Sequence, residues 1–382
     1  MILYERRFPL KRQYFRIGML SVILLVALRL SIGWHFLYEG VWKVDNSDTF
    51  SALPFLTLSK GPFAPIFYAM APDLDGKLRL KAEGVDATWH EMKDVKVDVV
   101  PNKDIPEGVV PEVKSSYNLE EKSGTIAVYP AYYKEVEKIY HFAMSEYKPD
   151  ENQKKELQVA WGKYVLAEKA AVEADAEGVS AYLEALKRFE DAKNAGNNGP
   201  EQMKRLWADM LKLRREAADF LSVQESLAKS FRNQLYTIFE EQQKVQPLPE
   251  FVVATDLLPF GLNLPFVGKS WTNFLNFAVT WALTLIGACL VLGFCTRLAA
   301  IGGGCFLISV LMTQPPWPAI FPPVHPEVGH ALVVDKNFVE MVAIFMLATL
   351  PVGRWGGLDF FVWHWLGKPI FTSLGWYVEE EA

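Results

Sequence analysis

Charged and amide side chains that lie in or beside long apolar runs are the residues of this sequence most able to do chemistry. They occur in LRLSIGWHFLYEGVWKV, residues 28–44, and in VVDKNFVEMVAIFML, residues 333–347. A charge in membrane hydrocarbon is costly, so such residues mark a binding site, a proton path or a buried pair. Glu340, and His330 just before the second run, could carry protons. The candidate ligand-binding residues are Arg29, Glu39, Lys43, Lys336, Asn337 and Glu340.

This set of residues suits an anionic or quinone-like ligand. A quinone site needs an apolar slot, a donor to each carbonyl oxygen and a titratable group that passes protons. Lys336 or Asn337 could be the donors. The same residues also have a structural interpretation. Arg29 could be a clamp satisfied by carbonyls or by a carboxylate of a neighbouring helix, and the others could be helix caps and interfacial anchors.

The polar residues of the first apolar run share one helix face with two glycines. Spacings of four, three, four and three place five residues on this face: Arg29, Gly33, Phe36, Gly40 and Lys43. Two glycines there allow another backbone to approach closely, as in tightly packed membrane helices. We therefore expect this face to be buried in protein, with the helix that carries Glu340 as its neighbour.

Four apolar runs predict four membrane crossings. The first, residues 17–38, corresponds to roughly 33 Å of helix and follows a cluster of arginines and lysines, which favours a cytoplasmic N-terminus. A cleaved signal peptide is the alternative, but the run is long and no small-x-small site follows it. The other crossings are expected at residues 274–294, 299–312 and 337–352.

The predicted fold is mainly α: a four-helix transmembrane bundle with a large, coiled-coil-like exoplasmic insertion. We expect a multi-pass protein of the inner membrane with both termini cytoplasmic and residues 45–270 periplasmic. The predicted domains are the N-terminus and first helix (1–44), the insertion (45–270), helices two to four (271–354) and an interfacial C-terminal segment (355–382). Within the insertion we expect an interfacial segment (50–77), an extended region (78–130) and helical hairpins (131–245).

Helical periodicity dominates the second half of the insertion. The predicted helices are residues 131–146, 151–175, 178–195 and 200–244. The last carries an apolar seam with three-four spacing, interrupted by Gln224, which is typical of a coiled coil or helical bundle. An antiparallel hairpin that folds on itself and a docking arm for a partner protein both fit this pattern. The seam residues are Leu206, Met210, Leu213, Ala217, Phe220, Leu227, Phe231 and Ile238.

Composition and motifs exclude several classes of function. A net charge of -6 and the absence of a basic aromatic groove argue against nucleic acid as a partner. HPEVGH, residues 325–330, is not a His-Glu-x-x-His motif, and the prolines of the loop that contains it oppose a helix, so no metal site is predicted. No sequence motif for an intrinsic cofactor is present, so a redox cofactor would be a mobile lipid quinone or belong to a partner. The cysteines could exchange thiols or simply pack in apolar segments: Cys289, Cys295 and Cys305.

Three motifs in order resemble the DoxX/DoxD family of small four-helix membrane proteins. They are the residues 28–44 quoted above, GACLVLGFCTRLAAIGG at 287–303, and VVDKNFVEMVAIFMLATLPVGRWGGLD at 333–359. The segment GPFAPIFYAMAPDLDG, residues 61–76, is similar to the one after the first helix in longer members. The resemblance covers roughly residues 17–76 and 271–361, and the helical insertion between the first two helices departs from the minimal family pattern.

The family resemblance implies a membrane subunit associated with quinone-linked or thiol/sulfur redox chemistry that acts with partner proteins. The family's namesake is similar to a subunit of a thiosulfate:quinone oxidoreductase, and relatives are associated with redox maturation of other proteins. Membrane lipid and further membrane or periplasmic proteins are therefore the expected partners. The alternative is a non-enzymatic scaffold or accessory subunit whose helical domain docks a partner.

Overall fold

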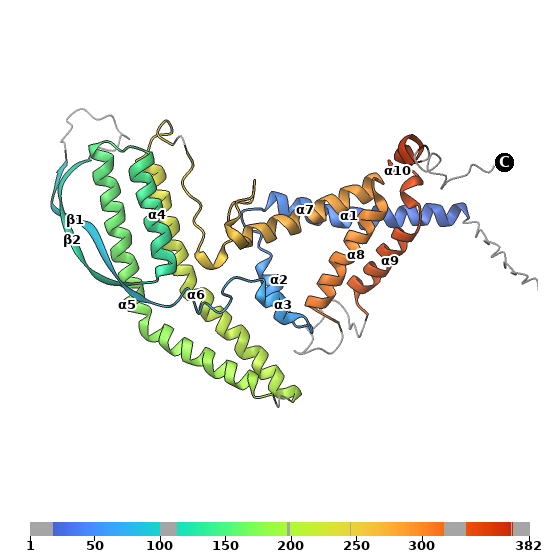
Figure 1. The fold of residues 1–382 in the computed structure, drawn as a ribbon, viewed down its shortest axis with the longest axis horizontal. Helices are drawn as coiled ribbons and strands as arrows, with labels where there is room; N and C mark the ends of the chain where they lie inside the picture. Colours follow the sequence, from blue (N-terminus) through green and yellow to red (C-terminus); the bar gives the residue numbers. More distant parts are fainter. Residues whose placement is uncertain are drawn as a thin grey trace, which may run out of the picture. The chain divides into compact units, whose positions relative to one another are not determined.

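The computed structural model describes residues 18–99, 113–196, 199–244, 246–316, 334–367 and 369 (Figure 1). The chain is mainly helical, as the sequence predicts. It divides into two compact units. The first, called here the apolar unit, takes the chain up to Ala52 and from Asn276 onward. The second, the insert unit, is Leu53–Leu275.

Within the described residues, three helices are long and apolar enough to cross a membrane. They are α1 (Met19–Asp45), α7 (Trp271–Leu292) and α8 (Thr296–Thr313). Their number and composition support the prediction of a membrane protein with several apolar helices. The proposed sidedness of the termini and of the insertion does not follow from the helices themselves and stays a prediction.

The fourth predicted crossing forms α9 (Lys336–Thr349), which has 14 residues. At 1.5 Å per residue it is about 21 Å long, shorter than the ~30 Å of bilayer hydrocarbon. It ends before residue 352 because Leu350 precedes Pro351, a position that disfavours the helical conformation, and Leu350 is extended with φ -107° and ψ 150°. Three short elements follow: η3 (Val352–Arg354), α10 (Asp359–Val362) and η4 (Trp363–Gly367). The predicted interfacial segment 355–382 continues beyond the described residues.

Helices α1, α7, α8 and α9 share one apolar core. Leu290 of α7, Ala300 of α8 and Ile344 of α9 are fully buried in it. The predicted face of α1 is the buried one, with Arg29, Ile32, Gly33, Phe36 and Gly40 inside. The helical spacing of the first polar motif therefore identified the packed side of α1 correctly.

The glycines of α1 pack against α7 rather than against the helix that carries Glu340. A Cβ placed on Gly33 would lie 2.8 Å from Leu290 Cβ, and one on Gly40 would lie 2.7 Å from Thr284 Cα. Gly287 of α7 lies equally close to the α1 backbone. Both helices thus use glycine at their contact, which is how membrane helices bring their backbones together.

A methyl group at this helix contact is expected to destabilise the apolar unit. We expect Gly40→Ala to lower its free energy of unfolding by about 1–3 kcal/mol, because the backbone of α7 must move. Gly302→Ala on α8 is the matched control, since its Cβ would meet only Ile286 at an ordinary 3.6 Å. Thermal unfolding of the full chain in detergent measures both. Equal melting temperatures for Gly40→Ala and Gly302→Ala would contradict a tight α1–α7 contact.

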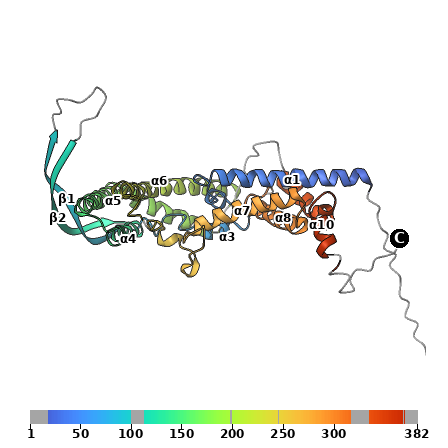
Figure 2. The ribbon, with the colours of Figure 1, turned by 90° about the horizontal axis from the view of Figure 1, so that it is seen from above.

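The insert unit contains a strand hairpin, β1 and β2, and the long helices α4, α5 and α6 (Figures 1 and 2). Strand β1 (Glu83–Val99) pairs antiparallel with β2 (Val113–Val128), and the register shifts between Lys93 and Lys96. The hairpin lies against α5, where the Trp161 indole N–H donates to the Thr88 carbonyl at 3.0 Å. The remaining elements are α2 (Leu53–Thr57), α3 (Ala64–Ala69), α4 (Pro130–Glu146), α5 (Glu151–Asn194), α6 (Pro200–Ile238), η1 (Ala254–Asp256) and η2 (Pro259–Gly261).

Helix α5 is continuous where the sequence predicts two helices. Gly178 lies inside it, and a Cβ there would approach the Phe220 ring of α6 at 3.3 Å. The packing of α5 on α6 offsets the roughly 1 kcal/mol that glycine costs in a helix interior. Asp150 begins the helix with a capping box, accepting from the Asn152 and Gln153 amides at 2.8 Å.

The predicted seam of α6 is buried against the rest of the insert unit. Leu206, Met210, Leu213, Ala217 and Phe231 are all core residues. Helices α5 and α6 lie side by side along their length (Figure 1). The bundle interpretation therefore holds for this seam, and the seam itself is not free to dock a partner.

Candidate functional site

Arg29 lies at the centre of a junction between α1, the α7–α8 turn and the segment after α9. Its side chain is 1 % exposed. Nη1 donates to the Val352 carbonyl at 3.1 Å, and Nη2 donates to the Gly356 carbonyl at 3.4 Å. The Asp359 carboxylate supplies nearby negative charge. The structural interpretation of Arg29 as a clamp satisfied by carbonyls matches these contacts.

The same junction explains the second and third sequence motifs. Asp359 accepts from the backbone amides of Cys295 at 2.7 Å and Thr296 at 2.9 Å, which begin α8. Its own amide donates to the Gly293 carbonyl at 2.7 Å. Gly293 and Cys295 both have positive φ, at 64° and 48°. Arg29, LGFCTR and VGRWGGLD are thus three parts of one structural junction.

The second group of predicted site residues lies where α1 meets α9. Nδ1 of His35 lies 2.9 Å from Oε1 of Glu340. Lys43 pairs with Glu39 at 2.8 Å, and the Glu39 carboxylate lies within electrostatic range of His35 and Lys336. We call this group the α1/α9 polar cluster: His35, Glu39, Lys43, Lys336 and Glu340.

The structure therefore separates the predicted ligand-binding set. Glu39, Lys43, Lys336 and Glu340 come together in the polar cluster, whereas Arg29 belongs to the junction beyond the other end of α9. Asn337 lies beside the cluster, where its amide donates to Asp335, the N-cap of α9, at 3.3 Å. His330 lies outside the described residues, so its predicted role as a proton carrier stays a prediction.

His35 and Asp359 are the site residues that sequence reasoning missed. His35 stands in the quoted apolar stretch, six residues after Arg29. A histidine in a candidate membrane span is itself a signal of function, because intramembrane ionisable residues are rare. Asp359 carries no such signal, since its role as the cap of α8 depends on a contact between residues more than 60 apart.

The His35–Glu340 pair lies near the middle of α1 and at the surface of the apolar unit. Residue 32 is the midpoint of α1, so His35 lies about 4.5 Å from the middle of the helix. The His35 side chain is 56 % exposed on the surface of the unit, while Glu340 is 16 % exposed. A histidine and a carboxylate that share a hydrogen bond can exchange a proton. The His35 side chain is thus accessible to a molecule that covers this surface of the apolar unit.

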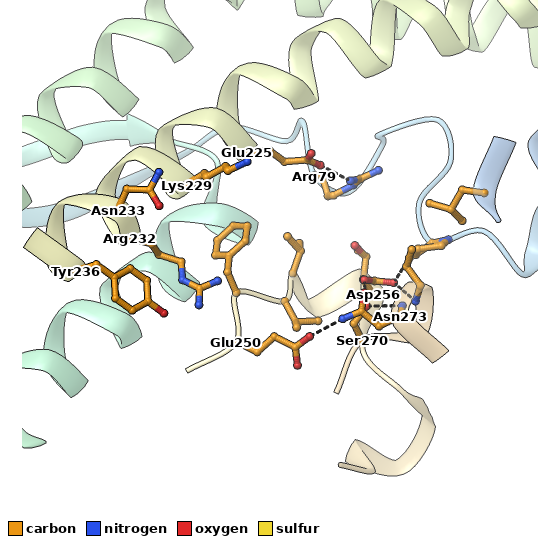
Figure 3. A pocket seen from close by; sticks show the side chains of 17 residues that line it. Arg79, Glu225, Lys229, Arg232, Asn233, Tyr236, Glu250, Asp256, Ser270 and Asn273 are labelled. Atoms are coloured by element: carbon orange, nitrogen blue, oxygen red, sulfur yellow. Dashed lines mark hydrogen bonds and ion pairs between the residues drawn. The ribbon is translucent and has the colours of Figure 1, made fainter. Parts of the chain in front are cut away.

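The insert unit holds a separate pocket of about 670 Å³ (Figure 3). Most of its charges already have partners: Arg79 bonds to Asp73 at 3.3 Å and pairs with Glu225 at 3.7 Å. Burial raises the pKa of Glu225 above its usual value, and Arg79 opposes this shift. Arg232, whose Nε is buried without an acceptor among the described residues, also lines the pocket. The lining of the pocket thus carries charges of both signs.

Two acidic residues on the other side of the pocket, Asp256 and Glu250, form hydrogen bonds with residues at the start of α7. Asp256 accepts from the Ser270 hydroxyl at 2.6 Å and from the Thr272 amide at 2.9 Å. Glu250 accepts from the Asn273 side chain at 2.7 Å (Figure 3). The Asp256 carboxylate thus caps the N-terminus of α7, where negative charge is favourable, and Glu250 binds a side chain of the same turn.

Within the described residues, no group of histidines, cysteines and acids is arranged to hold a metal ion. Cys289, Cys295 and Cys305 are free thiols. Comparison with protein-family models, with curated proteins and with solved structures finds no match.

Proposed function

We propose that the chain is a DoxX-like, multi-pass inner-membrane subunit associated with quinone-linked or thiol/sulfur redox chemistry. In this proposal α1, α7, α8 and α9 form the four-helix membrane bundle, both termini are cytoplasmic, and residues 45–270 are periplasmic. The three sequence motifs support the family, and the apolar helices support the membrane location. The observation that carries the functional part is the hydrogen bond between His35 and Glu340.

A polar pair on the outer surface of membrane helices needs something to cover it. Contact of His35 and Glu340 with acyl chains would leave the unused polar atoms without partners, at a cost of several kcal/mol. A ligand with a flat apolar body and carbonyl oxygens removes this cost, because it accepts from a ring N–H and covers the surface. Quinone has this chemistry and is dissolved in the same hydrocarbon.

The residues of the polar cluster have distinct roles in this proposal. His35 would donate from Nε2 to a ligand carbonyl, because its Nδ1 already faces Glu340 at 2.9 Å. When the Nε2 proton passes to the ligand, the Glu340 carboxyl would supply a proton to Nδ1. Lys336 and Lys43 provide positive charge near the pair. A bound quinone supplies two-electron, two-proton redox chemistry, and its electrons come from a partner protein.

Removing the Glu340 carboxylate is expected to weaken quinone binding. We expect Glu340→Gln to raise the dissociation constant of the purified protein for decylubiquinone by about 10- to 100-fold, as lost charged hydrogen bonds do. Asp45→Asn is the matched control, because Asp45 is an exposed carboxylate at the end of α1 and lies outside the polar cluster. The binding is measured in detergent by titration, alongside the amount of quinone that co-purifies. Equal affinity of wild type and Glu340→Gln would overturn the role of the pair.

The second candidate function is a non-enzymatic membrane scaffold or accessory subunit whose helical domain docks a partner. The hydrogen bonds from Arg29 to backbone carbonyls favour this alternative, because they give a buried charge of the apolar unit a structural role. Under this alternative no quinone co-purifies with the wild-type chain. Glu340→Gln then lowers only the melting temperature, because it breaks a contact between α1 and α9.

A further inference from the structure

The loop before α7 exposes two phenylalanines completely. Phe260 is 100 % exposed and Phe266 is 98 % exposed, in the stretch LLPFGLNLPFVG at 257–268. This stretch contains no charged residue. Its other apolar side chains are divided, since Leu258 and Val267 are buried while Leu257 and Leu262 remain exposed. Single exposed apolar residues are ordinary on a protein surface, but a contiguous exposed group marks an interaction site.

The backbone holds both phenylalanines in an unusual conformation. Their φ angles are 61° and 67°, a region that bulky side chains rarely adopt. Each follows a proline in the sequence Leu-Pro-Phe, and each turn is closed by a hydrogen bond across four residues. The Gly261 amide donates to the Leu258 carbonyl at 3.2 Å, and the Val267 amide donates to the Leu264 carbonyl at 3.3 Å. These are type II turns in which phenylalanine occupies the position that usually requires glycine.

Neither packing nor backbone geometry within the insert unit explains why both turns carry phenylalanine at this position. A side chain without packing contacts contributes nothing to the core, and glycine or asparagine would relieve the backbone. Strained residues persist where the surrounding structure enforces them and are concentrated at functional positions. The two rings are therefore presented outward for contact with something else.

The loop is fixed to the first turn of α7. Asp256 at its start accepts from Ser270 and from the Thr272 amide, and the Leu258 amide donates to the Lys269 carbonyl at 2.8 Å. Phe266 is five residues before Trp271, so the chain between them spans at most about 17 Å. Helix α7 is one of the three helices able to cross a membrane. Wherever α7 enters the bilayer, the loop lies beside that entry point.

We infer that residues 257–268 form a membrane-inserting loop that places Phe260 and Phe266 in the lipid interface of the leaflet where α7 begins. The absence of charge and the continuity with a membrane helix favour lipid over a protein partner. Aromatic side chains concentrate at this depth of the bilayer. The loop anchors the insert unit beside the membrane at its connection to α7. The inference depends on α7 crossing the membrane and is independent of any quinone chemistry.

Photo-crosslinking from the phenylalanine positions tests this assignment. The full chain carries p-benzoylphenylalanine in place of Phe260, of Phe266 or of Glu241, in vesicles of phosphatidylethanolamine and phosphatidylglycerol. Glu241 is the control, because its side chain is 91 % exposed in the same unit and carries a charge. After irradiation, mass spectrometry of the intact chain identifies what each position has bound.

We expect lipid adducts at positions 260 and 266 in at least fivefold higher yield than at position 241. Equal yields at the three positions would overturn the inference. Adducts to a second copy of the chain, or no adduct at all, would also overturn it. At positions 260 and 266 the change replaces an exposed ring with a related ring, and at position 241 it replaces an exposed side chain. Folding is therefore expected to be preserved at all three positions, and gel filtration verifies it. Failure of quinone binding in the Glu340 experiment would leave this result unaffected.

Discussion

Replacing Arg29 with methionine should destabilise the apolar unit by about 3–5 kcal/mol, the cost of breaking a buried charged contact by removing one partner. Methionine keeps most of the side-chain length but cannot donate hydrogen bonds. The carbonyls of Val352 and Gly356 would lose their donor, and Asp359 would lose the nearby positive charge. Because Asp359 also caps α8, the loss would spread from one side chain to the α7–α8 turn.

Two further variants distinguish the clamp from a general effect of polarity. Arg29→Lys keeps the charge but lacks the planar fork that reaches two carbonyls, so its melting temperature should lie between wild type and Arg29→Met. Leu30→Ala on the neighbouring, exposed side of α1 is the control, since the Leu30 side chain does not contribute to the buried junction. Thermal unfolding of the full chain in detergent gives the order of stability. A wild-type melting temperature for Arg29→Met would show that the junction does not depend on this residue.

The buried face of α1 could be predicted because helical spacing is a property of one segment. Arg29, Gly33, Phe36 and Gly40 are all inside, as the spacing of four, three and four requires. The neighbour of that face could not be predicted in the same way. Gly287 of α7 has no special position in its own helix, and only the three-dimensional contact pairs it with α1.

In the candidate site, too, the sequence pattern indicates individual residues but not which distant residue each one contacts. The sequence predicts Glu340 as a candidate site residue but does not indicate His35 as its partner, although His35 stands in the same polar motif as Arg29. The two residues are 305 apart, and no local pattern encodes such a distance. Composition alone groups Arg29 with Glu340, because both are charges in apolar helices, whereas their contacts place them in separate sites.

In the insert unit, the residue that broke the apolar seam has a specific role. Gln224 is buried, and its side-chain amide faces the Glu168 carboxylate on α5; with the amide nitrogen assigned to that side, it donates to both carboxylate oxygens. Glu168 is fully buried and also accepts from the Tyr129 amide at 3.2 Å. A single polar residue in a seam signals a buried polar contact, but the sequence does not identify the partner on another helix.

Burial of Glu168 should make the stability of the insert unit depend on pH. Desolvation raises the pKa of Glu168 from its ordinary 4.5 to about 7 in the folded chain. Between these values the folded state holds a proton that the unfolded state has lost, so stability falls as pH rises from 4.5 to 7. The change is at most about 3 kcal/mol, and donation from Gln224 to the ionised carboxylate reduces it. Above pH 7 this contribution is constant.

Glu168→Gln is expected to remove this dependence. The amide stays neutral at every pH and its oxygen still accepts from Tyr129, so the variant should be more stable than wild type at pH 8 and similar at pH 5. Glu173→Gln is the matched control, because Glu173 lies on the same helix with a side chain that is largely exposed. Hydrogen exchange of peptides from α5 and α6 in the full chain measures the local free energy of opening. An unchanged pH slope in Glu168→Gln would mean that Glu168 is ionised throughout, because two donors can hold a buried carboxylate charged without help from a proton.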